Sequence, residues 1–243
     1  ALSEIEYYNA AGKTDESRLV LAGLKAQYIE NDDIKYGEAA INMSAGRYSD
    51  AIKTISGLLA VDPGNEKYLR LLAGAQKASS NAAGASDTYS RLIEAGVADA
   101  DLFMQRAECY RQTGEYSKAL RDIERYLAIY PENSSAIRIA GKTVAASGDN
   151  LKAIEYFSRN LELNPDDPRC YIDRGDSYFV GKSWGWAIND YAMSLDLDEQ
   201  NENDLEAVIF RFYPQLQEIK RFFQARGAEL SLVTGSGSAV YGL

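Results

Sequence analysis

The sequence contains no histidine among its 243 residues. Histidine is the commonest general base and the commonest metal ligand, so its absence removes the Ser/His and Cys/His nucleophile pairs and argues against most hydrolase mechanisms. Cysteine is scarce, and Cys109 and Cys170 lie far apart without the spacing of a metal site or a disulfide framework. We expect two free, buried thiols, no metal site and no cofactor.

Long apolar runs are also missing. No stretch approaches the roughly 20 apolar residues that a membrane-spanning helix needs, so a soluble chain without a membrane span is expected. The first residues, ALSEIEYYNA, have neither a basic nor an apolar leader region. Because residue 1 is Ala rather than Met, we expect a processed or trimmed chain, and the compartment stays open between the cytoplasm and export after removal of a signal peptide.

Positive charge is in deficit. The chain has 26 basic and 36 acidic residues and a formal net charge of -10, which opposes non-specific attraction to nucleic acid and to anionic membrane surfaces. We therefore expect no nucleic-acid partner. The apolar content of 46% is sufficient for a buried core, so a disordered chain is not expected.

A 34-residue repeat runs through most of the chain. The segments GRYSDAI (46–52) and GEYSKAL (114–120) are offset by 68 residues, which is twice this period. In windows that begin at residues 32, 66, 100, 134 and 168, position 20 is always alanine, position 8 is always small and position 24 is always bulky. The residues at these positions are, in turn, Ala51, Ala85, Ala119, Ala153 and Ala187; Ala39, Ala73, Ala107, Gly141 and Gly175; and Ile55, Tyr89, Ile123, Phe157 and Tyr191.

These residues resemble the tetratricopeptide repeat (TPR) family over about 200 residues, most clearly in window 100–133. The resemblance implies an all-α, right-handed solenoid of about six helical hairpins, with helix A near positions 2–14 and helix B near positions 16–29 of each window. The windows are 1–31, which is shortened, and then 32–65, 66–99, 100–133, 134–167 and 168–201.

The turns between the expected helices carry their own signals. Glycine is suited to the turn from helix A to helix B, and proline prevents helix B from continuing. The expected turn glycines are Gly46, Gly114 and Gly148, and the prolines are Pro63, Pro131 and Pro165.

The resemblance also implies a concave groove lined by positions 2, 5, 9 and 12 of helix A. In the three middle windows six of these twelve positions are basic, with Asp101 and Glu108 as acidic exceptions. Two interpretations stay open: solvated cations with local ion pairs, or a clamp for an acidic peptide or a C-terminal carboxylate. The candidate groove residues are Lys67, Arg70, Lys77, Arg111, Arg138 and Lys142.

The repeat pattern stops at about Glu202. Apolar periodicity through 205–223, interrupted near Pro214, predicts a capping helix on the last hairpin, and the strand-like LSLV follows. The NDLE start, the YP pair and TGSGSAVYG resemble the carboxyl end of GHMP-family small-molecule kinases, most closely 4-diphosphocytidyl-2-C-methyl-D-erythritol kinase. That resemblance implies an anion-binding loop made of Gly235, Ser236, Gly237 and Ser238.

The expected function is a non-catalytic scaffold or adaptor that binds a peptide or protein partner in the groove of a TPR array (1–201), followed by a capping and kinase-like segment (202–243). The alternative is a TPR regulatory or targeting region fused to a fragmentary GHMP-type kinase. No ATP-binding glycine motif precedes the tail, so phosphoryl transfer is not expected. Trp184 and Trp186 are expected to lie in the core or to cover a helix seam. The oligomeric state stays open.

Overall fold

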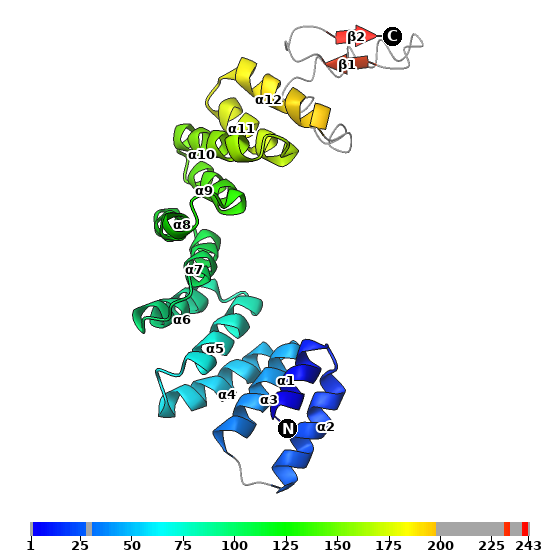
Figure 1. Cartoon of the computed structure of the whole chain (residues 1–243), viewed down its shortest axis with the longest axis vertical. Coiled ribbons are helices and arrows are strands. Elements are labelled where there is room, and N and C mark those ends of the chain that lie inside the picture. The colour runs from blue at the N-terminus through cyan, green and yellow to red at the C-terminus, as the bar shows by residue number, and fades with distance from the viewer. Residues whose placement is uncertain (1, 28–30, 198–230, 234–239, 243) are drawn as a thin grey trace. The chain divides into compact units, whose positions relative to one another are not determined.

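The computed structural model describes residues 2–27, 31–197, 231–233 and 240–242 (Figure 1). Within these ranges the chain forms twelve α-helices and two short strands. They are α1 (Leu2–Ala10), α2 (Thr14–Gln27), α3 (Asp32–Ser44), α4 (Tyr48–Val61), α5 (Glu66–Ala78), α6 (Ala82–Glu94), α7 (Asp101–Gln112), α8 (Tyr116–Ile129), α9 (Ser134–Ala146), α10 (Asn150–Leu163), α11 (Pro168–Val180), α12 (Trp184–Leu197), β1 (Ser231–Val233) and β2 (Val240–Gly242).

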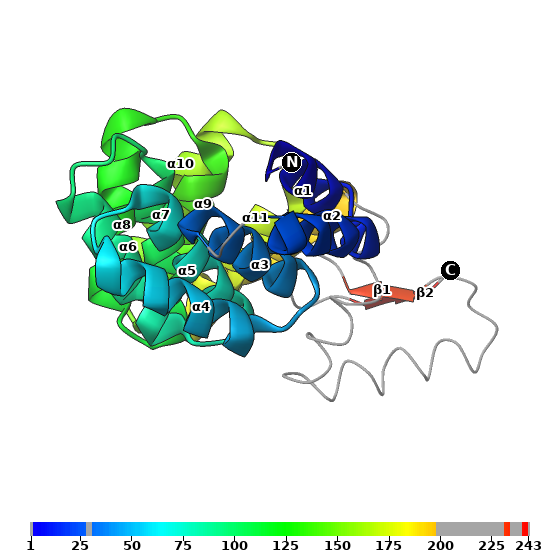
Figure 2. The same ribbon diagram turned by 90° about the horizontal axis from the view of Figure 1, so that it is seen from below.

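The chain divides into two compact units, residues 1–129 and residues 130–243. The first unit holds α1–α8, and the second holds α9–α12 with the two strands. Within each unit, helices that follow one another in the sequence pack together, and α1 and α2 both contact α3 (Figure 2). The predicted all-α array of helical hairpins is confirmed.

The helix bounds follow the 34-residue windows closely. Window 100–133 predicts helices near 101–113 and 115–128, and the structure places α7 at Asp101–Gln112 and α8 at Tyr116–Ile129. The side chain before an A helix often caps it: Asn65, Asn133 and Asp167 each accept a hydrogen bond from a backbone N–H in the first turn of α5, α9 and α11. The repeat period and its capping residues therefore set where the helices begin and end.

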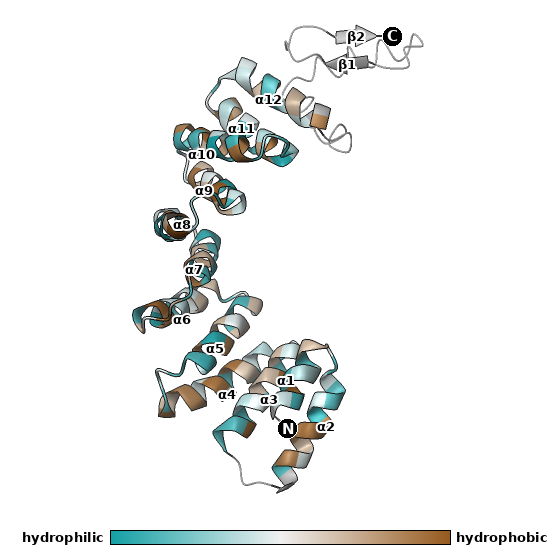
Figure 3. Cartoon of the chain, in the orientation of Figure 1, coloured by the Kyte–Doolittle hydropathy of each residue, from teal (hydrophilic) through white to brown (hydrophobic). Residues whose placement is uncertain are grey.

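The repeated small and bulky positions form the core. The five alanines at position 20 are at most 1% exposed, and Ile55, Ile123 and Phe157 at position 24 are equally buried. Phe157 on α10 packs so closely over Gly141 on α9 that a Cβ there would lie 2.5 Å from the ring. Hydrophobic and hydrophilic residues alternate along most helices (Figure 3), as stacked amphipathic hairpins require.

The turns from helix A to helix B share one backbone conformation. Gly46, Gly114 and Gly148 have φ values of 72°, 77° and 93°, as their prediction as turn glycines implies. Ser80 and Lys182 occupy the same repeat position with φ values of 62° and 59°. The array therefore imposes a left-handed residue at this turn even where the sequence supplies no glycine.

Two further expectations concern the cysteines and the tryptophans. Cys109 and Cys170 are free and buried, as predicted. Trp184 and Trp186 are 43% and 64% exposed and do not lie in the core, but they cover the α11–α12 seam as the second alternative predicted. Trp186 stacks on Tyr178 of α11 with a centroid distance of 6.1 Å, and Trp184 meets Phe179 edge-on at 4.9 Å.

The C-terminal segment is described only at its strands. Within the strand-like LSLV, Ser231–Val233 form β1, which pairs antiparallel with β2 in a register that sets Leu232 opposite Tyr241. The predicted capping helix at 203–226 and the loop Gly235–Ser238 lie outside the described residues. Both stay predictions.

Candidate functional site

The six candidate groove cations all lie on A helices. Lys67, Arg70 and Lys77 are on α5 and Arg111 is on α7 in the first unit, whereas Arg138 and Lys142 are on α9 in the second. Because these residues belong to different compact units, they form two sets.

In the first set, two cations on the first half of α5 are held by acidic side chains. The Nζ atom of Lys67 lies 3.0 Å from Oε1 of Glu6 on α1 and 4.2 Å from the ring centroid of Tyr36. The hydrogen bond to Glu6 is the largest factor that raises the pKa of Lys67. Arg70 donates to Glu66 at 2.8 Å and to Asp99 at 2.9 Å. The Lys67–Glu6 pair connects α5 with α1, and the Arg70–Asp99 pair connects α5 with the segment before α7.

Lys77 and Arg111 together have fewer acidic partners than Lys67 and Arg70 have. Lys77 donates to the amide oxygen of Gln105 on α7 at 2.7 Å, a neutral acceptor that leaves the positive charge uncompensated at that contact. Arg111 donates from Nη1 to Glu108 at 2.7 Å, but its Nε is buried and has no hydrogen-bond partner within the described residues. This part of the α5–α7 face therefore retains a positive charge at Lys77, and beneath it a buried donor of Arg111 lacks an acceptor among the described residues.

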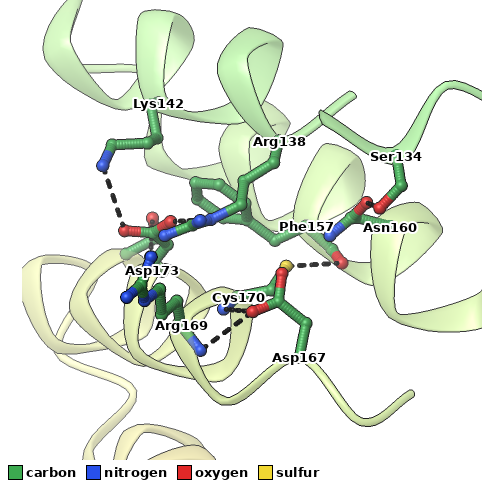
Figure 4. A network of polar contacts seen from close by, with 10 residues as sticks. Ser134, Arg138, Lys142, Phe157, Asn160, Asp167, Arg169, Cys170 and Asp173 are labelled. Atoms are coloured by element: carbon green, nitrogen blue, oxygen red, sulfur yellow. Dashed lines mark hydrogen bonds and ion pairs between the residues drawn. The ribbon is translucent and has the colours of Figure 1, made fainter. Parts of the chain in front are cut away.

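In the second set, one carboxylate joins the two cations. Asp173 on α11 lies 2.6 Å from Nε of Arg138 and 3.7 Å from Nζ of Lys142, and Figure 4 shows it between the two side chains. A cavity of about 260 Å³ is lined by Lys142, Asp173 and Asp176, among others. Burial raises the pKa of Asp176, and the hydroxyl of Tyr191 donates a hydrogen bond of 2.8 Å to its carboxylate.

The buried polar groups beside this set are structural rather than reactive. Ser134 donates to Oδ1 of Asn160, and the Cys170 thiol points at the carbonyl oxygen of Phe157 (Figure 4). Burial raises the pKa of Cys170 to about 11, so the thiolate needed for nucleophilic chemistry is disfavoured. Within the described ranges no group of His, Cys, Asp and Glu side chains is placed to hold a metal ion.

The sequence pattern located the cations but missed their partners. Gln105 and Asp173 both occupy position 6 of their windows, in two repeats that are 68 residues apart, and each accepts from the preceding A helix. A search for polar residues at position 6 would have found both. Lys77, Arg138 and Lys142 thus each contact the next A helix, and the contacts of Arg138 and Lys142 are ion pairs.

Comparisons with known proteins agree with the hairpin architecture. A family model described as "Tetratricopeptide repeat" matches residues 100–133. A heat shock protein sti1 homolog of Schizosaccharomyces pombe is 27% identical over 204 residues, which are 80% of this chain and 30% of that protein. The crystal structure of YrrB, described as a TPR protein with an unusual peptide-binding site, superposes with a TM-score of 0.63 at 16% identity and covers 77% of this chain and 96% of that one.

The C-terminal resemblance also has a counterpart. The 4-diphosphocytidyl-2-C-methyl-D-erythritol kinase of Solibacter usitatus is 51% identical over 41 residues, which are 17% of this chain and 13% of the kinase. The chain spans less than a third of the length of the curated relatives it matches, with 11% and 17% of the first two. No helix in the described part of the chain is long and apolar enough to cross a membrane.

Proposed function

We propose, from the premise that this chain is an array of tetratricopeptide repeats, that it is a non-catalytic scaffold that binds a carboxylate-bearing segment of a protein partner along its A helices. Stacked hairpins offer an extended face rather than an enclosed pocket, which suits an extended peptide. The peptide-binding site described for YrrB supports the same use of the fold.

The observation that carries the proposal is that Lys77 and Arg111 lack part of the charge compensation and hydrogen bonding that their side chains can form. Lys77 faces a neutral amide, and Arg111 has a buried Nε without an acceptor among the described residues. A peptide carboxylate beside α5 and α7 would supply the negative charge that Lys77 lacks, and the Arg111 side chain, which is 26% exposed, would donate to the same carboxylate. Arginine and lysine bind carboxylates by charge-assisted hydrogen bonds, which are stronger than neutral ones.

The remaining cations are available to an acidic peptide by exchange. Lys67 and Arg70 are 52% and 41% exposed, and their partners Glu6 and Glu66 are exposed to a similar degree. Exposed ion pairs contribute only about 0.2–1 kcal/mol, so a ligand carboxylate displaces an internal one at little cost. In the second unit, Lys142 shares Asp173 with Arg138 and borders the cavity, where it is 46% exposed.

The experiment measures the affinity of the full chain for two fluorescent peptides by anisotropy. One peptide is rich in Asp and Glu and ends in a free carboxylate, and the other has Asn, Gln and a C-terminal amide at the same positions. We expect the acidic peptide to bind and its affinity to fall with added salt. Replacing Lys77 and Arg111 by Gln should weaken binding at least about tenfold, which is roughly 1.4 kcal/mol.

The matched control removes two charges elsewhere. Lys53 on α4 and Lys182 in the α11–α12 turn are exposed, and the Lys53→Gln/Lys182→Gln variant loses the same net charge. It should bind the acidic peptide nearly as well as the unaltered chain. Equal losses in the two variants would show that overall charge, rather than the A-helix face, governs binding.

A kinase activity is not proposed. The match to the kinase covers only 13% of that protein, and the loop Gly235–Ser238 lies outside the described residues. The helices that the structure describes offer no further observation in favour of a nucleotide site or of phosphoryl transfer.

A further inference from the structure

A second basic site lies on the α7–α8 hairpin, apart from the candidate groove residues. A cavity of about 170 Å³ is lined there by Arg106, Tyr110, Lys118, Arg121, Asp122 and Arg125. Four cations face one carboxylate in a chain whose net charge is -10. The cavity is smaller than the roughly 300–1,000 Å³ of pockets for drug-sized ligands, so it suits a small anion or the head group of a side chain.

The floor of this α7–α8 pocket is a rigid buried ion pair. Arg106 donates two parallel hydrogen bonds of 2.7 Å to Asp122 and a third, of 2.9 Å, to Ser90 on α6. The two charged side chains are only 11% and 4% exposed. A guanidinium has five N–H donors, so two remain for a ligand after these bonds are made. Arg106 is thereby held in one orientation before any ligand binds.

The rim of the pocket carries cations that are less strongly paired. Lys118 forms an ion pair with Glu115 and lies 5.3 Å from the centroid of the Tyr110 ring. Arg125 approaches Asp122 only to 3.8 Å. Arg121 is exposed and makes no hydrogen bond or ion pair with the part of the chain that the structure describes.

The same floor recurs 68 residues later with a different rim. Arg174 donates two hydrogen bonds of 2.7 Å to Asp190 and one of 3.1 Å to Ser158. The positions of Lys118, Arg121 and Arg125 are there occupied by Trp186, Asn189 and Met193. The buried Arg–Asp pair is thus present in a repeat that lacks the three rim cations. We therefore attribute the pair to helix packing in the array, and the basic rim requires a separate explanation.

The pocket and the candidate groove face different ways on helix α7. Successive residues of an α-helix turn by about 100°, so Arg106 and Tyr110 share one face, and groove positions such as Glu108 and Arg111 lie roughly 100–160° away from it. A ligand of the α7–α8 pocket therefore does not compete directly with a peptide on the A-helix face.

We propose that the α7–α8 pocket is a binding site for a phosphate group, carried by a phosphorylated side chain of a protein partner or present as a free anion. A phosphate dianion presents acceptor oxygens to several donors at once, and arginine side chains match its geometry. The two remaining N–H groups of Arg106 and the unpaired Arg121 supply donors from the floor and from the rim. Lys118 and Arg125 add positive charge around them.

Calorimetry on the full chain tests the proposal with four probes: inorganic phosphate, a neutral peptide with one phosphoserine, the same peptide with serine, and the same peptide with glutamate. We expect the phosphoserine peptide to bind with one site per chain and the serine peptide not to bind. Phosphopeptide binding at least tenfold tighter than that of inorganic phosphate identifies a protein partner as the source, and equal affinities identify the free anion. Absence of binding by both phosphate probes, or equal binding of the glutamate peptide, overturns the proposal.

Two single substitutions of exposed residues test the phosphate site without disturbing the fold. Arg121→Ala should weaken phosphate binding about tenfold with an unchanged melting temperature, whereas Lys53→Ala, at the same repeat position on α4, should have no effect. Unchanged affinity in Arg121→Ala, or an equal loss in both variants, contradicts the assignment. The Lys77→Gln/Arg111→Gln variant should still bind the phosphopeptide, so failure of the groove proposal and failure of this one are distinguishable.

A transplant of the rim provides the strongest test. The variant Trp186→Lys/Asn189→Arg/Met193→Arg builds the basic rim on the existing Arg174–Asp190 floor. Two phosphate sites per chain are expected in this variant. If it unfolds, as its circular dichroism would show, the Arg121→Ala and Lys53→Ala comparison decides alone. A folded variant that still binds one phosphate would refute the inference that floor and rim together make the site.

Discussion

Replacing Gly141 by alanine probes the tightest contact of the repeat. A Cβ at this position of α9 would lie 2.5 Å, 2.8 Å and 2.9 Å from three ring atoms of Phe157, which is 1% exposed. Carbon atoms pack best at about 3.5–4.0 Å, so the ring would have to move by about 1 Å within a filled core. Overpacking of this kind costs about 1–3 kcal/mol.

The substitution also has a favourable component, because alanine is better than glycine in a helix by about 1 kcal/mol. Gly57 on α4 isolates this component, since a Cβ there would meet nothing within 4 Å. Gly57→Ala should stabilise the chain, and Gly141→Ala should be less stable than Gly57→Ala by about 1–3 kcal/mol. Urea unfolding followed by circular dichroism measures both values.

A double-mutant cycle identifies the cause. Phe157→Leu removes the ring atoms that the new methyl group meets, so Gly141→Ala should cost at least about 1 kcal/mol less in that background. The packing argument would be refuted if Gly141→Ala stabilised the chain as much as Gly57→Ala, or if the two substitutions were additive.

The remaining predictions concern the repeat, the turns, a buried acid and the kinase-like tail. Ala119→Leu should destabilise the chain by about 1–3 kcal/mol, because Ala119 is fully buried, and an unchanged melting temperature would contradict the repeat register. Lys182→Gly should stabilise it by up to about 1–2 kcal/mol in urea unfolding, because the φ of 59° is strained for a side chain; a loss of stability would refute the strain. Burial raises the pKa of Asp176 above the ordinary value of 3.8, so its contribution to stability is present below that value and is lost as pH rises through the raised pKa. Asp176→Asn should therefore raise the melting temperature at neutral pH but not in acid, and the opposite pH dependence would contradict this sign. The chain should not transfer phosphate from ATP to a diphosphocytidyl substrate, and turnover that disappears on mutation of Gly237 would show otherwise.

The periodic parts of the fold were predictable because they depend on local spacing. Alanine at position 20 and a bulky residue at position 24 specify where helices approach, and these residues are buried as the windows predicted. The left-handed turns at Ser80 and Lys182 were not predictable from residue type, because the neighbouring helices impose a conformation that serine and lysine disfavour.

Side-chain partners were the least predictable feature. The groove cations were identified by position, yet whether Lys77 meets an acid or an amide depends on a helix 28 residues further along the chain. The sequence left open whether Trp186 lies in the core or covers a helix seam, and its stacking on Tyr178 at 64% exposure shows the second. The recurrence of Arg106 and Asp122 as Arg174 and Asp190, 68 residues apart, is a signal in the sequence that would have predicted both buried pairs.

The central claim is that the A helices of this array bind a carboxylate-bearing segment of a protein partner. Titration of the isotope-labelled full chain with the acidic peptide, followed through backbone amide chemical shifts, tests it most directly. The account predicts that the largest shifts lie on α5 and α7, around Lys77 and Arg111, and that the amidated Asn/Gln peptide causes none. Shifts confined to the B helices α4, α6 and α8, or no shifts with an excess of acidic peptide, would contradict it.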